Sequence, residues 1–371
     1  MKSKKWKRVF KKESYRKNYQ KRYICLAFSE KGGKRMNWYL QSNENSDVVK
    51  STRIRLARNL QNVRFNLNQK EEIEVLENKI KEGLYNIGYG LKFFKLKDMD
   101  DITKMSLVEK NLISPSFVLH KNETGSILIN DEENICIMVG NEDHIEIQIF
   151  NCGLDLDNTL NLAIEIDQKI EETLGYAIHK KYGYLTACPN NVGTGLRASV
   201  MVHLPALSKT KNTEKVLEAI NSFGINIRGV YGENTETTGD MYQISNKQTL
   251  GITEKEIIQN LQVIVEKIIK QERQARKILA KDELALEDII YRSYGILSNC
   301  RKISSEEART LLSNIKLGVD LGILKELSDL KVQKLYLYTK PANLQKYVGE
   351  QYEAIERDIK RAEVVQQIIK E

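Results

Sequence analysis

The chain has 371 residues, of which 29% are charged and 41% are hydrophobic, enough apolar material for one large domain and a smaller one. No segment approaches the ~20 consecutive apolar residues of a membrane-spanning helix, so a membrane span is excluded. The five cysteines are widely spaced and form no CxxC pair, which argues against a disulfide framework or a zinc site and favours a cytoplasmic location.

The positive charge is concentrated at the N-terminus. Residues 1–35 hold 14 of the 58 Lys and Arg residues but only two of the 50 Asp and Glu residues, so the remainder has 44 basic against 48 acidic residues. We interpret this stretch as a disordered extension or a wrongly assigned start, rather than as a nucleic-acid-binding arm, because blocks of like charge are usually solvated tails. Nucleic acid is therefore not an expected partner.

The central part of the chain predicts a sheet. Residues 135–139 and 145–150 flank a short polar segment, which predicts an antiparallel hairpin with acidic residues at its tip. Alternation in Ile145-Glu-Ile-Gln-Ile149 predicts a half-buried strand, with the isoleucines on one face and polar residues on the other. Further strands are expected at 199–204 and 241–244, and helices at 160–174 and 214–222. The expected fold class is α+β, a mainly antiparallel sheet flanked by helices.

From Thr253 onward the pattern is helical. The capping boxes Thr253-x-x-Glu256 and Ser304-x-x-Glu307 each predict the start of a helix, Pro341 interrupts the chain, and a last helix is expected over 352–371. We therefore expect a sheet domain and an all-helical C-terminal domain that packs directly on it. The expected segments are 1–35 for the basic extension, 36–252 for the sheet domain and 253–371 for the helical domain.

Arginines in three short motifs indicate an anion-binding site. The motifs are Ser51-Thr-Arg53-Ile-Arg55, Gly195-Leu-Arg197 and Arg228-Gly-Val-Tyr-Gly-Glu233. A guanidinium presents a planar fork of donors to phosphate oxygens, and the glycines of Gly193-Thr-Gly195 would let the backbone approach a phosphate. Any one of these arginines alone would be an ordinary surface residue. The chain contains neither a P-loop nor a Rossmann glycine pattern.

Extended to Ser51–Asn59 and Cys188–Pro205, these motifs resemble the ATP:guanido phosphotransferase family, most closely its bacterial protein-arginine kinases. The resemblance covers Met36 to the C-terminus. Only about 15 residues separate Met36 from the first motif, whereas the small-molecule kinases of this family carry a helical domain there. Arg357-Asp-Ile-Lys-Arg-Ala362 resembles the family's phosphoarginine-binding motif. The resemblance implies transfer of the γ-phosphoryl group of ATP to arginine side chains of proteins.

The resemblance also assigns roles to residues. Glu142 and Glu233 would orient the substrate guanidinium and accept its proton, and the Cys188 thiolate would help to hold it. Phosphoarginine binding is implied for Arg357, Asp358, Arg361 and Ala362. Nucleotide binding is implied for Ser51, Thr52, Arg53, Ile54, Arg55, Arg197, Ala198, Ser199, Val200, Met201, Arg228, Gly229, Val230, Tyr231, Gly232 and Glu233. The ATP phosphates would carry Mg²⁺, because the sequence indicates no carboxylate cluster with metal-ligand spacing.

Several positions depart from the family pattern. Gly140 and Asn141 stand where the family has Asn and Glu, and Asn111 replaces a histidine that borders the nucleotide. Glu146 replaces a nucleotide-contacting arginine. Loss of one charge-assisted bond to phosphate forfeits roughly 1.5–3 kcal/mol, so a weakened activity is expected.

Two other functions stay open beside the protein-arginine kinase. One is a phosphoarginine-binding adaptor with impaired catalysis, and the other is a small-molecule arginine kinase. For the leading function, the family implies protein substrates with exposed arginines, an activating adaptor, a Clp-type protease and a homodimer. It also implies that phosphorylation releases a DNA-binding protein or marks a substrate for degradation.

Overall fold

The computed structural model describes residues 36–371 apart from 66–69, 85–86, 122, 222–223 and 231–236, so the basic segment 1–35 lies outside the described residues. Its main feature is an eight-stranded sheet in the order β2-β3-β4-β5-β1-β8-β10-β9, in which all neighbouring strands are antiparallel. The strands are β1 (Val49–Arg58), β2 (Lys92–Lys95), β3 (Ser126–Ile129), β4 (Ile135–Val139), β5 (Ile145–Cys152), β8 (Leu196–His203), β9 (Ile225–Gly229) and β10 (Met241–Asn246). A separate two-stranded sheet pairs β6 (Ile178–His179) with β7 (Gly183–Tyr184). The expected fold class and the hairpin of β4 and β5 are confirmed.

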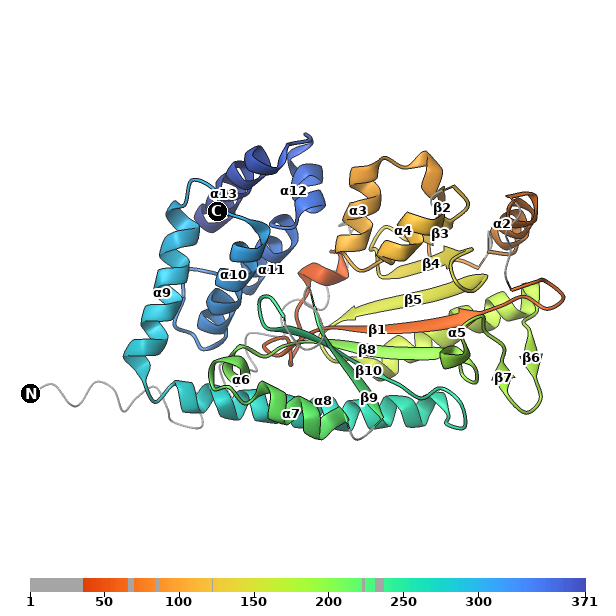
Figure 1. Ribbon diagram of the computed structural model, residues 1–371, viewed down its shortest axis with the longest axis horizontal. Coiled ribbons are helices and arrows are strands. Elements are labelled where there is room, and N and C mark those ends of the chain that lie inside the picture. Colours follow the sequence, from red (N-terminus) through yellow and green to blue (C-terminus); the bar gives the residue numbers. More distant parts are fainter. Residues whose placement is uncertain (1–35, 66–69, 85–86, 122, 222–223, 231–236) are drawn as a thin grey trace, which may run out of the picture.

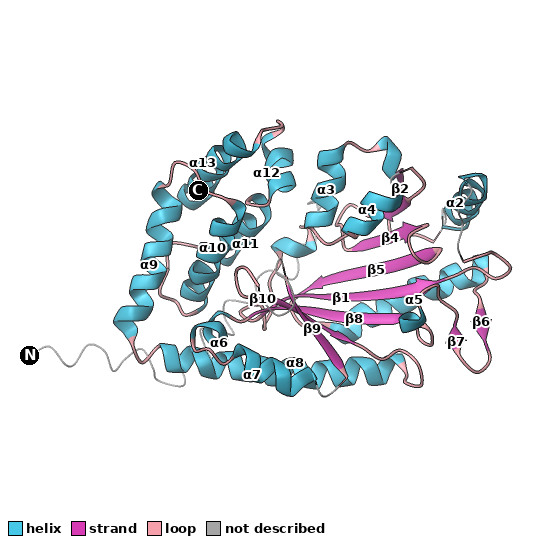
Figure 2. Cartoon of the chain, in the orientation of Figure 1, coloured by secondary structure: helices cyan, strands magenta, loops and turns pink. Residues whose placement is uncertain are grey.

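Helices flank the sheet and form one end of the molecule (Figures 1 and 2). The helices that accompany the sheet are η2 (Trp38–Leu40), α2 (Lys70–Leu84), η3 (Leu96–Asp98), α3 (Asp101–Glu109), α4 (Pro115–Lys121), α5 (Leu156–Leu174), η4 (Pro189–Asn191), α6 (Pro205–Lys209), α7 (Thr213–Asn221) and α8 (Glu254–Leu279). The C-terminal helices are α9 (Glu283–Asn299), α10 (Ser305–Asp320), α11 (Asp329–Tyr338), α12 (Pro341–Val348) and α13 (Ala354–Lys370). Thr253 forms the predicted capping box at the start of α8, whereas Pro341 begins α12 rather than only interrupting the chain.

One face of the sheet is packed against α5 and α8. Alternation along β1 turns Ile54 and Leu56 into this core, which also contains apolar side chains of both helices. The same alternation turns Arg53 and Arg55 to the opposite face. The sequence of β1 therefore holds its arginines on a rigid strand that is anchored from behind.

The described residues cover the opposite face over only part of its width. Around β3, β4 and β5 it packs against η2, α3 and α4 in a second apolar cluster that includes Trp38 and Phe117. The strand predicted at 145–149 is confirmed as part of β5, but its predicted half burial is wrong, because Glu146 and Gln148 are also buried. Gln148 is accommodated by donating a hydrogen bond to the Leu112 carbonyl at 2.8 Å. A sheet face covered by helices buries its polar positions as well as its apolar ones.

The C-terminal helices form their own core and contact the sheet domain. This core begins at Leu286 of α9, whereas α8 packs with the sheet, so the expected boundary at residue 253 falls on a helix of the first core. Glu109 of α3 joins the two parts by accepting hydrogen bonds from the backbone of Ala342 and Asn343, both at 2.8 Å, at the start of α12. Across the described residues, no helix combines the length and apolar character needed to cross a membrane.

Candidate active site

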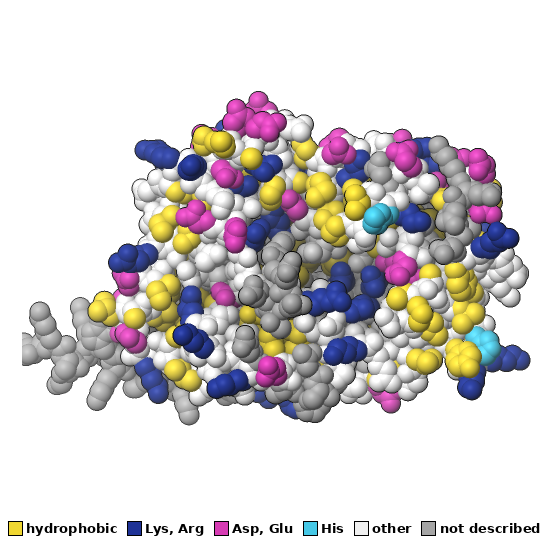
Figure 3. Space-filling view, in the orientation of Figure 1, with side chains coloured by type: hydrophobic (Ala, Val, Ile, Leu, Met, Phe, Trp, Pro, Cys, Tyr) yellow, Lys and Arg dark blue, Asp and Glu magenta, His cyan; other side chains and the backbone are white. Residues whose placement is uncertain are grey.

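Four arginines gather on the part of the sheet face that the described residues leave uncovered. Arg53 and Arg55 come from β1, and Arg197 and Arg228 come from β8 and β9. We call the cavity that these side chains line the arginine pocket; its lining is completed by Asn226, Gln243 and Ser245. Basic side chains are visible near the middle of the face in Figure 3. The sheet thus brings together arginines that lie up to 175 positions apart in the chain.

The arginines of this pocket raise one another's electrostatic energy. Burial together with the Arg55 and Arg197 guanidiniums lowers the pKa of Arg53 to about 9, which leaves Arg53 charged at neutral pH. Burial and the Arg55 and Arg228 charges likewise lower the pKa of Arg197. Such crowding favours binding of a multiply charged anion, because the anion relieves the repulsion.

A second cavity adjoins the arginine pocket and lies between the sheet domain and the C-terminal helices. We call it the interdomain pocket. Ser51, Met201 and Val230 line it from the sheet side, and Tyr336 and Leu337 of α11 line it from the helical side. Ser51 precedes Arg53 by two positions on β1, and Met201 pairs with Gln243 of the arginine pocket, so the two cavities are neighbours on one sheet face.

The interdomain pocket contains buried polar atoms that lack hydrogen-bond partners. Within the described part of the chain, the Tyr336 hydroxyl and the Gln333 side-chain oxygen are both buried without a partner, and both residues line this cavity. An unpaired buried polar group costs about 1–3 kcal/mol, so these atoms fit a pocket whose ligand supplies partners. Asn111 also lines this cavity, with a left-handed backbone at φ 62°.

The predicted nucleotide-binding residues divide between the two faces of the sheet. The side chains of Thr52 and Ile54 point away from the pockets, and the Thr52 hydroxyl donates to the Gly153 carbonyl at 2.7 Å. Ala198 and Val200 are also turned into the core, whereas Ser199 accepts a hydrogen bond from Arg53 Nε at 3.1 Å. Gly229 ends β9. Tyr231, Gly232 and Glu233 lie outside the described residues, so the prediction for Glu233 stays a prediction.

The glycines of Gly193-Thr-Gly195 have a packing reason that the sequence did not reveal. A Cβ on Gly193 would come within 2.2 Å of the Thr249 carbonyl oxygen, and one on Gly195 would come within 2.4 Å of the Arg58 guanidinium. Both also have positive φ, 113° and 64°. Arg58 itself is buried, pairs with Asp167 at 2.7 Å and donates to the Thr194 carbonyl at 2.9 Å. These glycines therefore approach the protein's own atoms rather than forming a phosphate loop.

Asp143 connects the two loops that carry Glu142 and Cys188. Glu142 is exposed at the tip of the β4–β5 hairpin, and its neighbour Asp143 is buried. One Asp143 oxygen accepts hydrogen bonds from Asn59 Nδ2 and from the Ala187 backbone, both at 2.7 Å. Ala187 precedes Cys188, which is half-buried and near enough to Arg197 to affect its pKa. Asp143 thus ties the loop of Glu142 to the loop of Cys188.

The structure corrects the expectation that the protein offers no carboxylate cluster. Carboxylate oxygens of Glu142, Asp143 and Glu146 all lie within 4.8 Å of one another. The sequence spacing hid this cluster because Glu146 was expected on an exposed strand face. The Arg55 guanidinium lies 3.5 Å from Glu146, so the cluster is at the edge of the arginine pocket.

The predicted phosphoarginine site is only partly supported by the geometry. Arg361 is 1% exposed, and its guanidinium already donates to the carbonyls of Thr339 and Ile303 and to Asp358. Arg361 therefore joins segments of the helical core, and its role in phosphoarginine binding stays a prediction. Ala362 is buried beside it, whereas Arg357 and Asp358 are partly exposed on α13.

Sequence reasoning missed the helical side of the interdomain pocket. Gln333 and Tyr336 lie on α11, whose sequence gives no sign of a ligand site. Only the tertiary contact between the two parts of the chain makes their unpaired atoms visible. No sequence signal for them was available.

Two family models match this chain. The model for "ATP:guanido phosphotransferase, C-terminal catalytic domain" matches residues 73–275, and the model for "Protein-arginine kinase McsB C-terminal domain" matches residues 283–371. Their junction lies between α8 and α9, where the apolar core changes.

Curated proteins and solved structures agree with these matches. A protein-arginine kinase of Halothermothrix orenii is 46% identical over 89% of this chain and 95% of its own length, and one of Bacillus pumilus is 45% identical over 89% and 92%. The duplicated taurocyamine kinase of Schistosoma mansoni superposes with a TM-score of 0.56 at 25% identity, over 76% of this chain and 40% of that chain. A lombricine kinase gives 0.53 at 25% identity, over 67% and 73%.

Proposed function

The chain belongs to the ATP:guanido phosphotransferase family, and we propose that it transfers the γ-phosphoryl group of ATP to arginine side chains of proteins. The observation that carries this proposal is the group of four arginines on one uncovered sheet face, held by strands whose other face is core. A polyphosphate is the ligand that this arrangement fits, because it supplies several negative charges to a crowded group of cations.

ATP fits the two adjoining cavities. Its phosphates would lie in the arginine pocket between Arg53, Arg197 and Arg228. Its nucleoside would lie in the interdomain pocket, where Tyr336 and Gln333 have polar atoms without partners. This placement makes the C-terminal helices part of the nucleotide site. It also explains why Ser51 and Met201 line one cavity while Arg53 and Arg55 line the other.

The reaction forms a bond between phosphorus and an arginine nitrogen and breaks the bond between the γ-phosphorus and the oxygen of ADP. The substrate guanidinium must give up a proton as the new bond forms, and a carboxylate has to receive it. Glu142 is our candidate, because it is exposed on a loop that Asp143 fixes beside Cys188. The arginine pocket would stabilise charge that develops on the transferred group.

A divalent metal accompanies ATP in this family, and we propose Mg²⁺, carried by the nucleotide phosphates. Mg²⁺ would neutralise part of the phosphate charge and orient the γ-phosphoryl group. Within the protein, Arg53 and Arg197 would fix the remaining oxygens on a strand pair that has little freedom to move.

A protein substrate is favoured over a free amino acid. The curated relatives that match nearly the whole chain are named protein-arginine kinases, and the second family model covers α9 to the C-terminus. Arg357, Asp358, Arg361 and Ala362 stay candidates for a phosphoarginine contact on α13. The activating adaptor, the Clp-type protease, the homodimer, the regulatory consequences and the cytoplasmic location stay predictions from the resemblance.

One experiment separates the three functions considered. The protein, with and without residues 1–35, is incubated with Mg-ATP and either an arginine-rich protein or free arginine, and acid-labile phosphate on arginine is sought by mass spectrometry. Label on protein arginines is the expected result. Label only on free arginine would support a small-molecule kinase. Binding of phosphoarginine without any transfer would support the adaptor.

A further inference from the structure

An exposed two-stranded arm projects from the end of the molecule at which β1 ends (Figure 1). We call residues 178–184, which form β6, β7 and the turn between them, the β6–β7 arm. Residues 178–182 are all exposed, and the apolar residues Ile178 and Tyr182 are 51% and 43% exposed. Figure 3 shows apolar, basic and histidine side chains together in this part of the surface, at the lower right. Among the described residues that line the arginine pocket and the interdomain pocket, none belongs to this arm.

The arm is tied to the protein at its base. The Tyr184 backbone N–H donates to the Gly193 carbonyl at 2.8 Å, and the Gly193 N–H donates back to the Tyr184 carbonyl at 3.2 Å. The guanidinium carbon of Arg58 lies 3.6 Å from the centre of the Tyr184 ring. Within the arm, the rings of His179 and Tyr182 stack with their centres 4.7 Å apart. Side chains that are already held in place lose little conformational entropy when a partner covers them.

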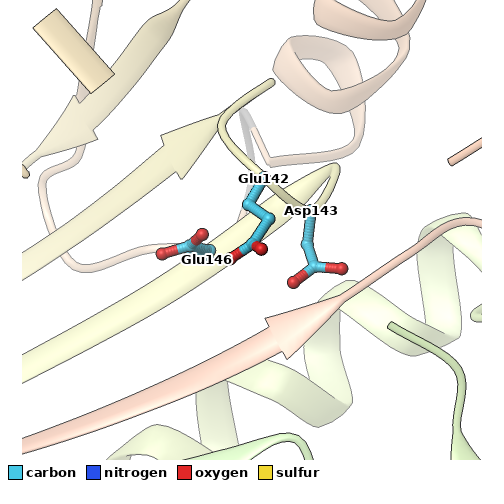
Figure 4. Close-up of side chains that lie close together, drawn as sticks. All are labelled: Glu142, Asp143 and Glu146. Atoms are coloured by element: carbon cyan, nitrogen blue, oxygen red, sulfur yellow. The ribbon is translucent and has the colours of Figure 1, made fainter. Parts of the chain in front are cut away.

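Asn59, which follows β1, connects the base of the arm to the tip of the β4–β5 hairpin. Its backbone carbonyl accepts a hydrogen bond from the Ala177 N–H at 2.8 Å, and its Nδ2 donates to the Leu185 carbonyl at 3.1 Å, so it holds the chain on both sides of the arm. The same Nδ2 donates to Asp143 Oδ1 at 2.7 Å. Asp143 and Glu142 lie next to each other at the hairpin tip in Figure 4. The position of the arm is therefore fixed relative to the loop of Glu142.

The turn of the arm carries two lysines without ionic partners. Across the described residues, neither Lys180 nor Lys181 forms an ion pair. The Lys181 Nζ lies 5.4 Å from the centre of the Tyr182 ring. Carboxylates of a partner would complement these two charges. Ile178 and Tyr182 offer apolar contact area, and tyrosine is one of the residue types that contribute most binding energy at protein interfaces. The arm thus fits a polypeptide with acidic and apolar side chains.

We propose that the β6–β7 arm docks the protein substrate by binding acidic and apolar residues near the arginine that receives the phosphoryl group. The proposal rests on the proposed kinase function. Cys188 is four positions beyond the arm, a chain length that spans at most about 14 Å, so a polypeptide whose arginine enters the site passes close to the arm. The transfer reaction itself treats all exposed arginines alike. Selection among them therefore depends on contacts outside the reacting group.

The test is a library of peptides that each contain one arginine at a fixed position and varied residues on both sides, with phosphorylated peptides identified by mass spectrometry. The unchanged protein should favour peptides with Asp or Glu near the arginine over peptides with Lys there. The double variant Lys180→Glu, Lys181→Glu should reverse this preference. The matched control is Lys270→Glu, Lys277→Glu, at exposed positions on α8, which changes the net charge equally and should keep the original preference.

The double variant Ile178→Ser, Tyr182→Ser tests the apolar contact. It should lower kcat/KM for the favoured peptides about tenfold, whereas calorimetry should show an unchanged affinity for Mg-ATP. Thermal denaturation shows whether each variant is folded. An unchanged preference in the lysine variant, an undiminished kcat/KM in the serine variant or the same shift in the control would overturn the proposal and leave the kinase function standing. A protein that phosphorylates no peptide would overturn both.

Discussion

Arg55 and Arg197 lie directly opposite each other on the antiparallel strands β1 and β8. Like charges at such paired positions destabilise a sheet by roughly 0.2–1 kcal/mol. Arg53 and Arg228 add to the same pocket, so the sheet carries this repulsion over several strands. The four arginines of the arginine pocket lower the stability of the sheet by their repulsion. Their arrangement therefore favours the binding of a polyanion.

The first prediction follows from that repulsion. Arg197→Gln should raise the thermal stability of the nucleotide-free protein while weakening ATP binding by about 1.5–3 kcal/mol, or some 10- to 150-fold. Differential scanning fluorimetry and isothermal titration calorimetry measure the two effects. Arg301→Gln, at an exposed position before α10, is the control and should change neither. A variant that is less stable and binds ATP normally would show that Arg197 is structural.

The second prediction concerns the nucleoside end of the site. Tyr336→Phe removes a buried hydroxyl that has no partner among the described residues, so the free protein should become slightly more stable. If ATP supplies the partner, its binding should weaken by about 0.5–1.5 kcal/mol. Inorganic tripolyphosphate, which lacks a nucleoside, should bind equally to both proteins. Equal loss for both ligands would place the effect in the phosphate region instead.

The third prediction concerns pH and the contact between β8 and the C-terminal helices. His203 is fully buried, its Nε2 lies 2.8 Å from Ser313 Oγ of α10, and burial together with Lys50 and Arg276 holds its pKa well below the usual range. The unfolded chain therefore takes up a proton near pH 6.5 that the folded chain refuses. Stability should fall as pH decreases below 6.5, by up to about 1.4 kcal/mol per pH unit from this group.

Urea denaturation at pH 7.5 and pH 5.5 measures this effect. His203→Gln should show a smaller decrease in stability between the two values than the unchanged protein, because carboxylates that titrate in this range are common to both. The same decrease in both proteins would mean that His203 is not the group responsible. His179→Gln, at an exposed position, serves as the control.

The sequence predicted the strands and the grouping of arginines in the arginine pocket better than it predicted which polar side chains are buried. The strand pattern around Ile145 and the motifs of Arg53 and Arg197 are local, and their outcome follows from alternation along a strand. Burial of Glu146 depends instead on η2, α3 and α4 covering that face, which no local pattern reveals. The carboxylate cluster was missed for this reason.

Residues that short motifs predict to contact a ligand can contact other parts of the protein instead or as well. The Arg361 guanidinium, which is predicted to bind phosphoarginine, also donates to the carbonyls of Thr339 and Ile303. Gly195 was expected to approach phosphate, but Arg58 fills that space. Conversely, Tyr336 gained a candidate role only through contact between parts of the chain that are far apart in sequence. Side-chain roles that depend on tertiary neighbours are not encoded in short motifs.

The most direct test of the central claim is phosphorus NMR of the protein mixed with Mg-ATP and an arginine-rich protein. The account predicts that a phosphoarginine signal grows on the substrate protein as ATP is converted to ADP. It also predicts that Arg53→Gln, which is in the arginine pocket, reduces the rate at least tenfold. A protein that binds Mg-ATP and yields no phosphoarginine, or an Arg53→Gln variant as fast as the unchanged protein, would contradict the account.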